Sequence, residues 1–146
     1  MYLDKELQLS ASQAVTADAL STDVLDLAVA GRALGNGEPL AILLNVEVAA
    51  DFTTGDETYE FKIQTDDASN FPSATDVAAY TKTAAQLAAG TNHILPLPAG
   101  ISLERYLALY FNVGGTSPSV TVSAWLIRQA DAEKYKAYAN ASRITG

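Results

Sequence analysis

The sequence predicts one all-β domain, built as an antiparallel sandwich or barrel, followed by a short C-terminal tail. Apolar residues alternate with polar ones at a period of two along most of the chain, which indicates half-buried strands. Turn residues separate these runs at short spacing, and no helices alternate with strands as a parallel sheet would require. With 146 residues, the chain is long enough to bury one core without disulfides.

Four segments carry the strongest strand patterns. Residues 40–48 place aliphatic side chains on one face and Ala41, Leu43, Asn45 and Glu47 on the other, as in a strand half-covered on its second side. Residues 58–65 alternate more cleanly, and residues 105–113 are apolar on both faces. Residues 119–128 put Trp125 and Ile127 opposite the aliphatic face. We expect burial of Ile42, Leu44, Phe61, Ile63, Leu109 and Leu126.

The remaining elements are shorter or ambiguous. Shorter strands are predicted over residues 5–9, 22–27 and 92–97. Gly114–Pro118 is rich in turn residues and predicts a hairpin between the last two strands. Residues 76–89 are rich in Ala and begin at a potential cap, Asp76, which favours a helix, but their β-branched residues and the following Gly90 disfavour one. Helix and strand both stay open there.

Composition excludes several functional classes. The absence of Cys removes disulfides, thiolate metal sites and cysteine nucleophiles, and a single His removes multi-histidine zinc sites. A net charge of −8 argues against nucleic-acid binding, which needs a basic surface. No stretch approaches the ~18 apolar residues of a membrane span, and no signal peptide is visible. We expect no nucleic-acid partner and no membrane partner.

Candidate chemistry is sparse. His93 lies in an alternating segment, and no G-x-S-x-G or comparable nucleophile motif accompanies it. The acidic loops at Asp51–Glu57 and Asp66–Asp67 have oxygen ligands for Ca²⁺ but lack EF-hand spacing, and the same residues are ordinary turn formers. Gly31–Gly37 lacks the Lys-Ser/Thr end of a phosphate loop. We therefore predict no enzymatic activity, no catalytic metal and no cofactor, and cation binding by the acidic loops stays open.

The C-terminal tail differs from the body in charge. We place the domain at residues 1–130 and the tail at 131–146. Residues 128–146 are net +2, so the rest of the chain carries −10. Tyr135 and Tyr138 share a face if the segment is helical. Two interpretations stay open, a fraying end and an arm that docks on a neighbour. The candidate interface residues of the arm are Lys134, Tyr135, Lys136, Tyr138 and Arg143.

Several segments taken in order resemble a known family. They are MYLDKELQLSASQAVTADALSTDVLDL at the N-terminus, the turn at Gly35–Leu40, L-P-L-P at Leu95–Pro98, R-Y-L-A-L-Y at Arg105–Tyr110, and the Gly-rich segment before V-T-V-S-A-W-L. Over residues 1–128 this pattern resembles the capsid cement (decoration) proteins of tailed phages, typified by the cement protein of a Bordetella podophage. The tail from Asp131 onward extends past the expected family core.

The resemblance implies a jelly-roll fold, no catalysis and no cofactor. It implies assembly in the host cytoplasm and binding to the outer surface of a phage head, where the protein would bridge neighbouring major capsid proteins. It also implies a homo-oligomer, for which we expect a dimer in preference to a trimer. We expect the tail to dock on an adjacent subunit or on the capsid. The alternative function is that of a carbohydrate-binding β-sandwich on a virion or cell surface, which needs a concave patch with exposed aromatic side chains.

Overall fold

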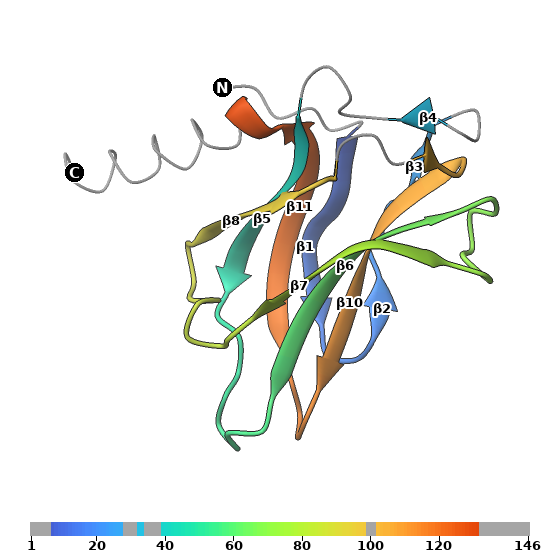
Figure 1. The fold of residues 1–146 in the computed structure, drawn as a ribbon. Coiled ribbons are helices and arrows are strands. Elements are labelled where there is room, and N and C mark those ends of the chain that lie inside the picture. The colour runs from blue at the N-terminus through green and yellow to red at the C-terminus, as the bar shows by residue number, and fades with distance from the viewer. Residues whose placement is uncertain (1–6, 28–31, 34–38, 99–101, 132–146) are drawn as a thin grey trace.

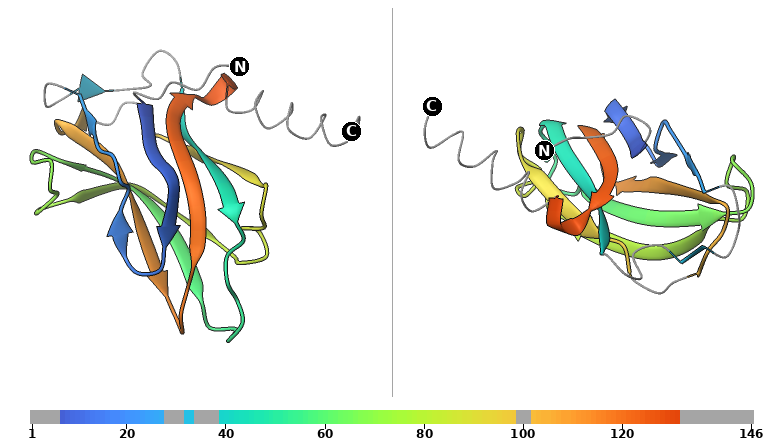
Figure 2. Two further views of the ribbon diagram at one scale, coloured as in Figure 1. Left: turned by 180° about the vertical axis from the view of Figure 1, so that it is seen from behind. Right: turned by 90° about the horizontal axis from the view of Figure 1, so that it is seen from above.

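The computed structural model describes residues 7–27, 32–33, 39–98 and 102–131, and its two larger antiparallel sheets pack face to face (Figures 1 and 2). The first sheet has the order β1-β11-β5-β8, with bounds Gln8–Val15, Val120–Arg128, Leu40–Val48 and Asn92–Pro96. The second has the order β2-β10-β6-β7, with bounds Ala19–Leu20, Tyr106–Gly114, Thr58–Asp66 and Thr75–Lys82. β3 (Leu25–Asp26) also pairs with β10, and β4 (Arg32–Ala33) pairs with β9 (Ser102–Leu103). The all-β prediction is confirmed.

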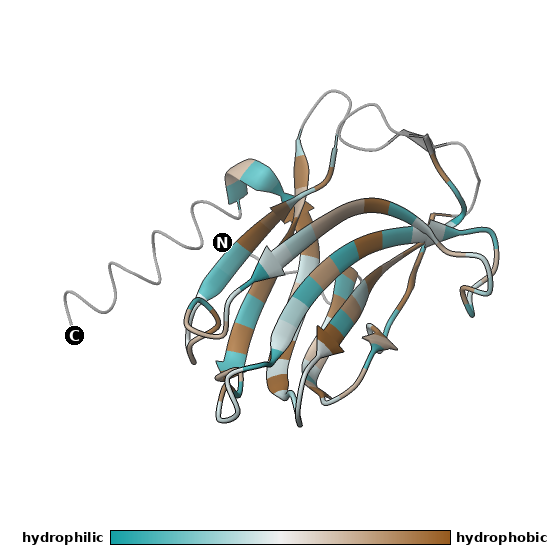
Figure 3. Ribbon diagram, turned by 60° about the horizontal axis from the view of Figure 1, so that its bottom comes forward, coloured by the Kyte–Doolittle hydropathy of each residue, from teal (hydrophilic) through white to brown (hydrophobic). Residues whose placement is uncertain are grey.

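The four strongest strand predictions are confirmed as β5, β6, β10 and β11, each within one residue at its ends. Hydrophobic and hydrophilic bands alternate along these strands, as Figure 3 shows. β1 spans Gln8–Val15, so it includes residues 8 and 9 of the predicted strand 5–9 and continues beyond it, while residues 5 and 6 lie outside the described residues. Within residues 22–27 only Leu25–Asp26 is a strand, whereas the predicted strand at 92–97 is confirmed as β8.

The ambiguous segment 76–89 divides into a strand and a turn. Its first part is β7, an edge strand that pairs with β6 and packs Val77 and Tyr80 against the core. The Tyr80 hydroxyl donates to the carbonyl of Pro96 in β8, which joins the adjacent edges of the two sheets. The second part is a turn in which the Thr83 hydroxyl accepts from the Gln86 amide at 3.2 Å. Sheet pairing thus overrides the helix propensity of the alanines.

The predicted hairpin at Gly114–Pro118 is wrong. β10 and β11 belong to different sheets, so the segment carries the chain from one layer to the other. Thr116 fixes this connection, because its amide and hydroxyl both donate to the Asp56 carboxylate, at 3.0 and 2.9 Å. Gly115 has φ +89°, and a Cβ there would lie 2.3 Å from the Asp56 carbonyl oxygen. The crossover therefore requires glycine at this position.

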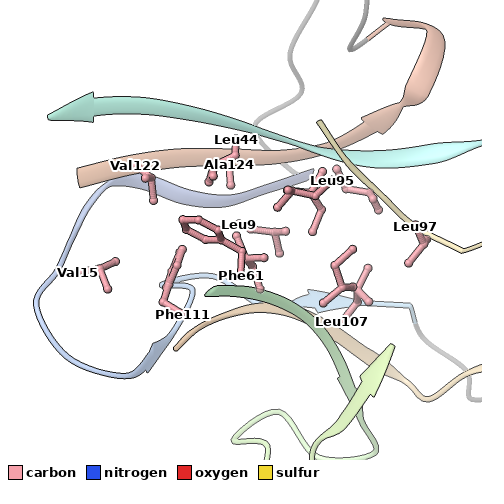
Figure 4. Close-up of a cluster of buried hydrophobic side chains, with 14 of the residues drawn as sticks. Leu9, Val15, Leu44, Phe61, Leu95, Leu97, Leu107, Phe111, Val122 and Ala124 are labelled. Carbon is pink, nitrogen blue, oxygen red and sulfur yellow. The ribbon is translucent and has the colours of Figure 1, made fainter. Parts of the chain in front are cut away.

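The core fills the space between the inner faces of the two sheets (Figure 4). Phe61 of β6 and Phe111 of β10 meet edge to face, with ring centroids 5.8 Å apart. All six side chains predicted to be buried are at most 5 % exposed. Burial of this apolar surface is the main stabilising contribution to the sandwich.

Candidate interaction surface

A second, smaller apolar cluster lies on the outer face of the first sheet. Ile42 and Leu44 of β5 point into the core, so the intervening Leu43 points away from it. Leu43 pairs directly with Trp125 of β11 and with Ile94 of β8. Ile127 completes the group, which forms a cluster separate from the main core. We call Leu43, Ile94, Trp125 and Ile127 the outer cluster.

The four members of the outer cluster differ in exposure. Leu43 is fully buried and Ile127 is 8 % exposed, while Ile94 and Trp125 remain partly exposed on either side of Leu43. A central aliphatic residue flanked by a partly exposed tryptophan is typical of the apolar centre of a protein–protein contact. Such a cluster on the outside of a sandwich is a candidate interaction surface.

Polar side chains next to the outer cluster are bonded to one another. The Asn45 side-chain amide donates to the Asn92 side-chain carbonyl at 2.8 Å. The Ser123 hydroxyl donates to the Glu47 carboxylate at 3.2 Å and accepts from the backbone amide of Ser12 at 2.9 Å. These groups form a polar border beside the apolar cluster, as at the rim of an interface.

The outer face of the second sheet carries a network of bonded polar side chains. Lys62 lies 3.3 Å from the Asp76 carboxylate and 3.9 Å from the Glu60 carboxylate. The Gln64 amide donates to Asp76 at 2.7 Å, and the Asn112 amide donates to Glu60 at 2.8 Å. This bonded network needs no partner to cover it.

The end of β11 directs the chain toward the tail. The Gln129 amide donates to the Pro39 carbonyl at 2.8 Å, and Arg128 pairs with Asp131 at 2.7 Å. The outer-cluster residue Ile127 thus lies four residues before the end of the described chain. The predicted interface residues Lys134, Tyr135, Lys136, Tyr138 and Arg143 lie outside the described residues.

His93 lies on β8, paired across the ladder with Leu44, and its Nε2 lies 3.1 Å from the Thr91 hydroxyl.

The carboxylates of the acidic loops accept hydrogen bonds from backbone amides. Burial alone would raise the pKa of Asp66, but the amides of Ser73 and Ala68, at 2.7 and 3.1 Å, hold it below its usual value.

Asp56 has a lowered pKa because the backbone amide and the hydroxyl of Thr116 donate to it. Both shifts favour ionised carboxylates, the opposite of what a general acid needs. Within the described residues, no three His, Cys, Asp or Glu side chains gather into a potential metal site. No helix in that part of the chain is long and apolar enough to cross a membrane.

The sequence patterns predicted the outward positions of some residues of the outer cluster. Alternation in residues 119–128 already placed Trp125 and Ile127 away from the aliphatic face, and Leu43 lay on the second face of its strand. Sequence reasoning nevertheless assigned the interface to the tail. What it lacked was the pairing of β11, β5 and β8, which brings apolar side chains from three separate segments together.

Two packed antiparallel sheets with an apolar outer patch define an all-β sandwich protein. The chain belongs to the Bbp16 family, which matches residues 9–126. The family name indicates a protein of a Bordetella phage, so the chain is grouped with phage proteins. No curated protein matches the chain.

Proposed function

We propose that this protein is a capsid cement protein, which binds the outer surface of a phage head and bridges neighbouring major capsid proteins. Membership of a phage protein family supports this role. The observation that carries the proposal is the outer cluster, because an apolar cluster flanked by a partly exposed tryptophan favours binding to another protein surface. The role is mechanical and involves no turnover.

The strand order supports a jelly-roll fold. Along the chain, β1 lies in the first sheet, β2 and β3 in the second, β5 in the first, β6 and β7 in the second, β8 in the first, β10 in the second and β11 in the first. Repeated crossing between two antiparallel sheets, here of four and five strands, is the connectivity of a jelly roll. It leaves the outer face of each sheet available for a different task.

The partners in this proposal are the major capsid protein and a second copy of the chain, with a homodimer favoured over a trimer. Each copy needs to contribute only a few kcal/mol, since many copies act along the same seams and local concentration on a capsid is high. Light scattering at tens of micromolar is expected to report a dimer. A trimer would contradict the expected stoichiometry, and a monomer would argue against a stable free oligomer.

A matched pair of substitutions tests the observation that carries the proposal. Trp125 and Tyr110 are both partly exposed aromatic residues on central strands, but they lie on opposite outer faces of the sandwich. Trp125→Ser should weaken binding to heads that lack this protein by at least about tenfold, because a central interface tryptophan typically contributes about 2 kcal/mol or more. Tyr110→Ser should leave head binding unchanged. Co-sedimentation measures both.

Three outcomes of this experiment count against the proposal. Wild-type protein that fails to bind heads would refute the cement function. Equal losses from the two substitutions would refute the assignment of the outer cluster as the contact. Binding to a glycan array with no binding to heads would favour the carbohydrate-binding alternative.

Truncation tests the contribution of the tail. Removing residues 132–146 keeps the Arg128–Asp131 pair and every described strand. We expect the truncated chain to fold with an unchanged circular dichroism spectrum and to bind heads or its own copies more weakly, because the tyrosines and basic residues of the tail are lost. Tail ion pairs alone contribute only ~0–1 kcal/mol each. Unchanged head binding and oligomeric state would assign no docking role to the tail.

A further inference from the structure

An apolar cavity lies at one end of the sandwich and has a volume of about 260 Å³. It is lined by Phe52 in the loop after β5, by residues 57–59 at the start of β6, and by residues 81–85 at the end of β7 and in the turn that follows. The loop of residues 49–57 is the lowest segment in Figure 1. Phe52 is 55 % exposed here although its side chain is large and apolar. An apolar group in the cavity would therefore bury surface that now faces water.

Hydrogen bonds fix the walls of the cavity. The Tyr59 ring is fully buried, and its hydroxyl lies 2.5 Å from the Asp51 carbonyl and 3.2 Å from the Ser119 amide. The Ala50 amide donates to the carbonyl of Leu87 at 3.0 Å, and Leu87 is fully buried in the core. The walls are thus joined to each other and to the core, and a preformed cavity lowers the conformational cost of binding.

The size and the lining of the cavity limit its occupant. A cavity of about 150 Å³ already accepts a benzene ring, whereas pockets for drug-sized ligands occupy about 300–1,000 Å³. At about 260 Å³ this cavity fits one aromatic side chain and not a larger molecule. Thr58, Thr81 and Thr83 belong to its lining, and their hydroxyls can bond a phenol hydroxyl. A tyrosine side chain therefore suits both the volume and the lining.

The charge at this end of the sandwich is negative. The cavity and its loop carry three acidic side chains, Asp51, Asp56 and Glu57, against one basic side chain, Lys82. Glu57 is only 4 % exposed, and its carboxylate accepts from two backbone amides of its own loop at 3.0 and 2.9 Å. It makes no ion pair within the described part of the chain. Since neutral amides do not cancel the charge of a carboxylate, this end attracts a cationic segment.

The C-terminal tail contains a segment with both properties. Residues 132–146 hold three basic side chains and one acidic side chain. In the sequence Tyr135 lies between Lys134 and Lys136, so one aromatic ring has a positive charge on each side. Tyr138 has alanine on both sides instead. Tyr135 and its two neighbours thus match the apolar volume and the negative charge of the cavity.

The length of the chain decides which copy can supply this segment. The cavity adjoins the start of β11, because the carbonyl of Ser119 accepts from the Asp51 amide at 2.8 Å, whereas the tail follows the other end of β11 (Figure 1). At about 3.3 Å per residue, β11 spans about 26 Å. The four residues from Asp131 to Tyr135 reach at most about 14 Å. Tyr135 therefore cannot reach the cavity of its own chain, and a second copy has to supply it.

We propose that Tyr135 of one copy fills the end cavity of a second copy, with Lys134 and Lys136 next to the acidic side chains of the loop of residues 49–57. The cavity and the start of the tail lie at opposite ends of the sandwich. A reciprocal exchange between two copies therefore requires them to lie antiparallel about a twofold axis. This inference rests on the homodimer proposed above and assigns it a specific contact, and it does not depend on binding to heads.

Cross-linking between introduced cysteines tests the contact in the full chain, which has no cysteine of its own. Chains with Ala85→Cys in the cavity lining are mixed with chains with Ala137→Cys in the tail, and a short bismaleimide joins thiols that lie close together. In the matched control, Ala17→Cys, an exposed position between β1 and β2 outside the lining, replaces Ala85→Cys. We expect the cavity position to form the heterodimer about tenfold faster than the control, because docking raises the local concentration of the two thiols.

Further substitutions assign the anchor and the role of charge. In the Ala137→Cys chain, Tyr135→Ser should slow the cross-link about fivefold, whereas Tyr138→Ser should change it by less than about twofold, because only the first removes the ring that fills the cavity. Lys82→Gln in the cavity chain should speed the reaction, because it removes a positive charge that repels the two tail lysines. High salt should slow it. Thermal unfolding checks that each variant remains folded.

A chain that carries both Ala85→Cys and Ala137→Cys tests the arrangement of the copies. Reciprocal exchange should give a covalent dimer and no larger product. A cross-link within one chain, at the mass of the monomer, would show that the tail reaches its own cavity and would overturn the assignment to a second copy. A ladder of higher oligomers would refute the twofold arrangement.

The proposal fails if Ala85→Cys and Ala17→Cys react equally fast, if Tyr135→Ser slows the reaction no more than Tyr138→Ser, or if Lys82→Gln slows it. Co-sedimentation of the uncross-linked chains with heads separates this failure from that of the cement function. Head binding without the cross-link would refute the tail contact alone. The cross-link without head binding would refute the cement function alone.

Discussion

The two outer faces of the sandwich differ in what covers their strands. On the first sheet, side chains of three strands meet in the apolar outer cluster around Leu43. On the second sheet, the equivalent positions form a bonded polar network centred on Lys62. In both sheets the apolar side chains at every second position point inward and form the core.

This difference shows how one fold separates stability from interaction. The inner faces bury the apolar surface that the fold requires, so the residues of the outer faces can differ without loss of the core. A polar network is satisfied in water, whereas an apolar cluster one side chain deep gains further stabilisation when another surface covers it. The first sheet therefore carries the proposed contact and the second remains solvated.

The largest expected effect distinguishes the core from the outer cluster within one strand. Leu44 and Leu43 are adjacent and both fully buried, but only Leu44 lies between the sheets. Leu44→Ala should lower the free energy of unfolding by about 3 kcal/mol, because the cavity left behind cannot collapse. Leu43→Ala should cost about half as much, since its neighbours can move and water can enter. Urea denaturation measures the loss of unfolding free energy for both variants. Equal losses would show that the outer cluster is packed as tightly as the main core.

A smaller effect is expected from Asp66, at the end of the polar face. Its folded-state pKa lies below the unfolded value of about 3.9, so the carboxylate stabilises the fold above that pH, and this contribution is lost as pH falls through the folded pKa. Asp66→Asn should lower Tm at pH 7 and flatten the decline of Tm as pH falls below about 4. The exposed Asp23 provides the control Asp23→Asn. An unchanged acid profile for Asp66→Asn would show that these amide bonds do not stabilise the fold.

The smallest effect is expected at the centre of the polar network. The hydrogen bond and charge of Asp76 raise the pKa of Lys62, so its contribution is complete below about pH 10, the unfolded value, and is lost as pH rises through the folded pKa. Lys62→Met should cause a slight loss of Tm at low salt that shrinks at high salt, because exposed pairs are screened. It should also reduce the fall in Tm above about pH 10. A large loss that is insensitive to salt would contradict the picture of a solvated face.

Sequence patterns predicted the strands in which burial of one face produces a period-two pattern of apolar residues. β5, β6, β10 and β11 are long, and their core-facing residues recur at every second position, so their ranges and six of their buried residues follow from periodicity. β7 lacks a clear period-two pattern because it lies at an edge and packs only part of one face on the core. The sequence therefore did not distinguish a helix from a strand there. The link at Gly114–Pro118 has hairpin composition, but composition does not report which sheet the next strand joins.

The sequence by itself determined the all-β class, the identity of the inner faces and the contrast between an acidic body and a basic tail, because these follow from residue order along one strand or one segment. Only the tertiary structure decided which outer face is apolar and where a cavity forms. Leu43, Ile94 and Trp125 lie on three strands that become neighbours only through pairing in the sheet. Phe52 and Lys82, 30 positions apart in the chain, line one cavity because the loop after β5 and the end of β7 lie at the same end of the sandwich. Long-range pairing creates such surfaces, and no local pattern encodes it.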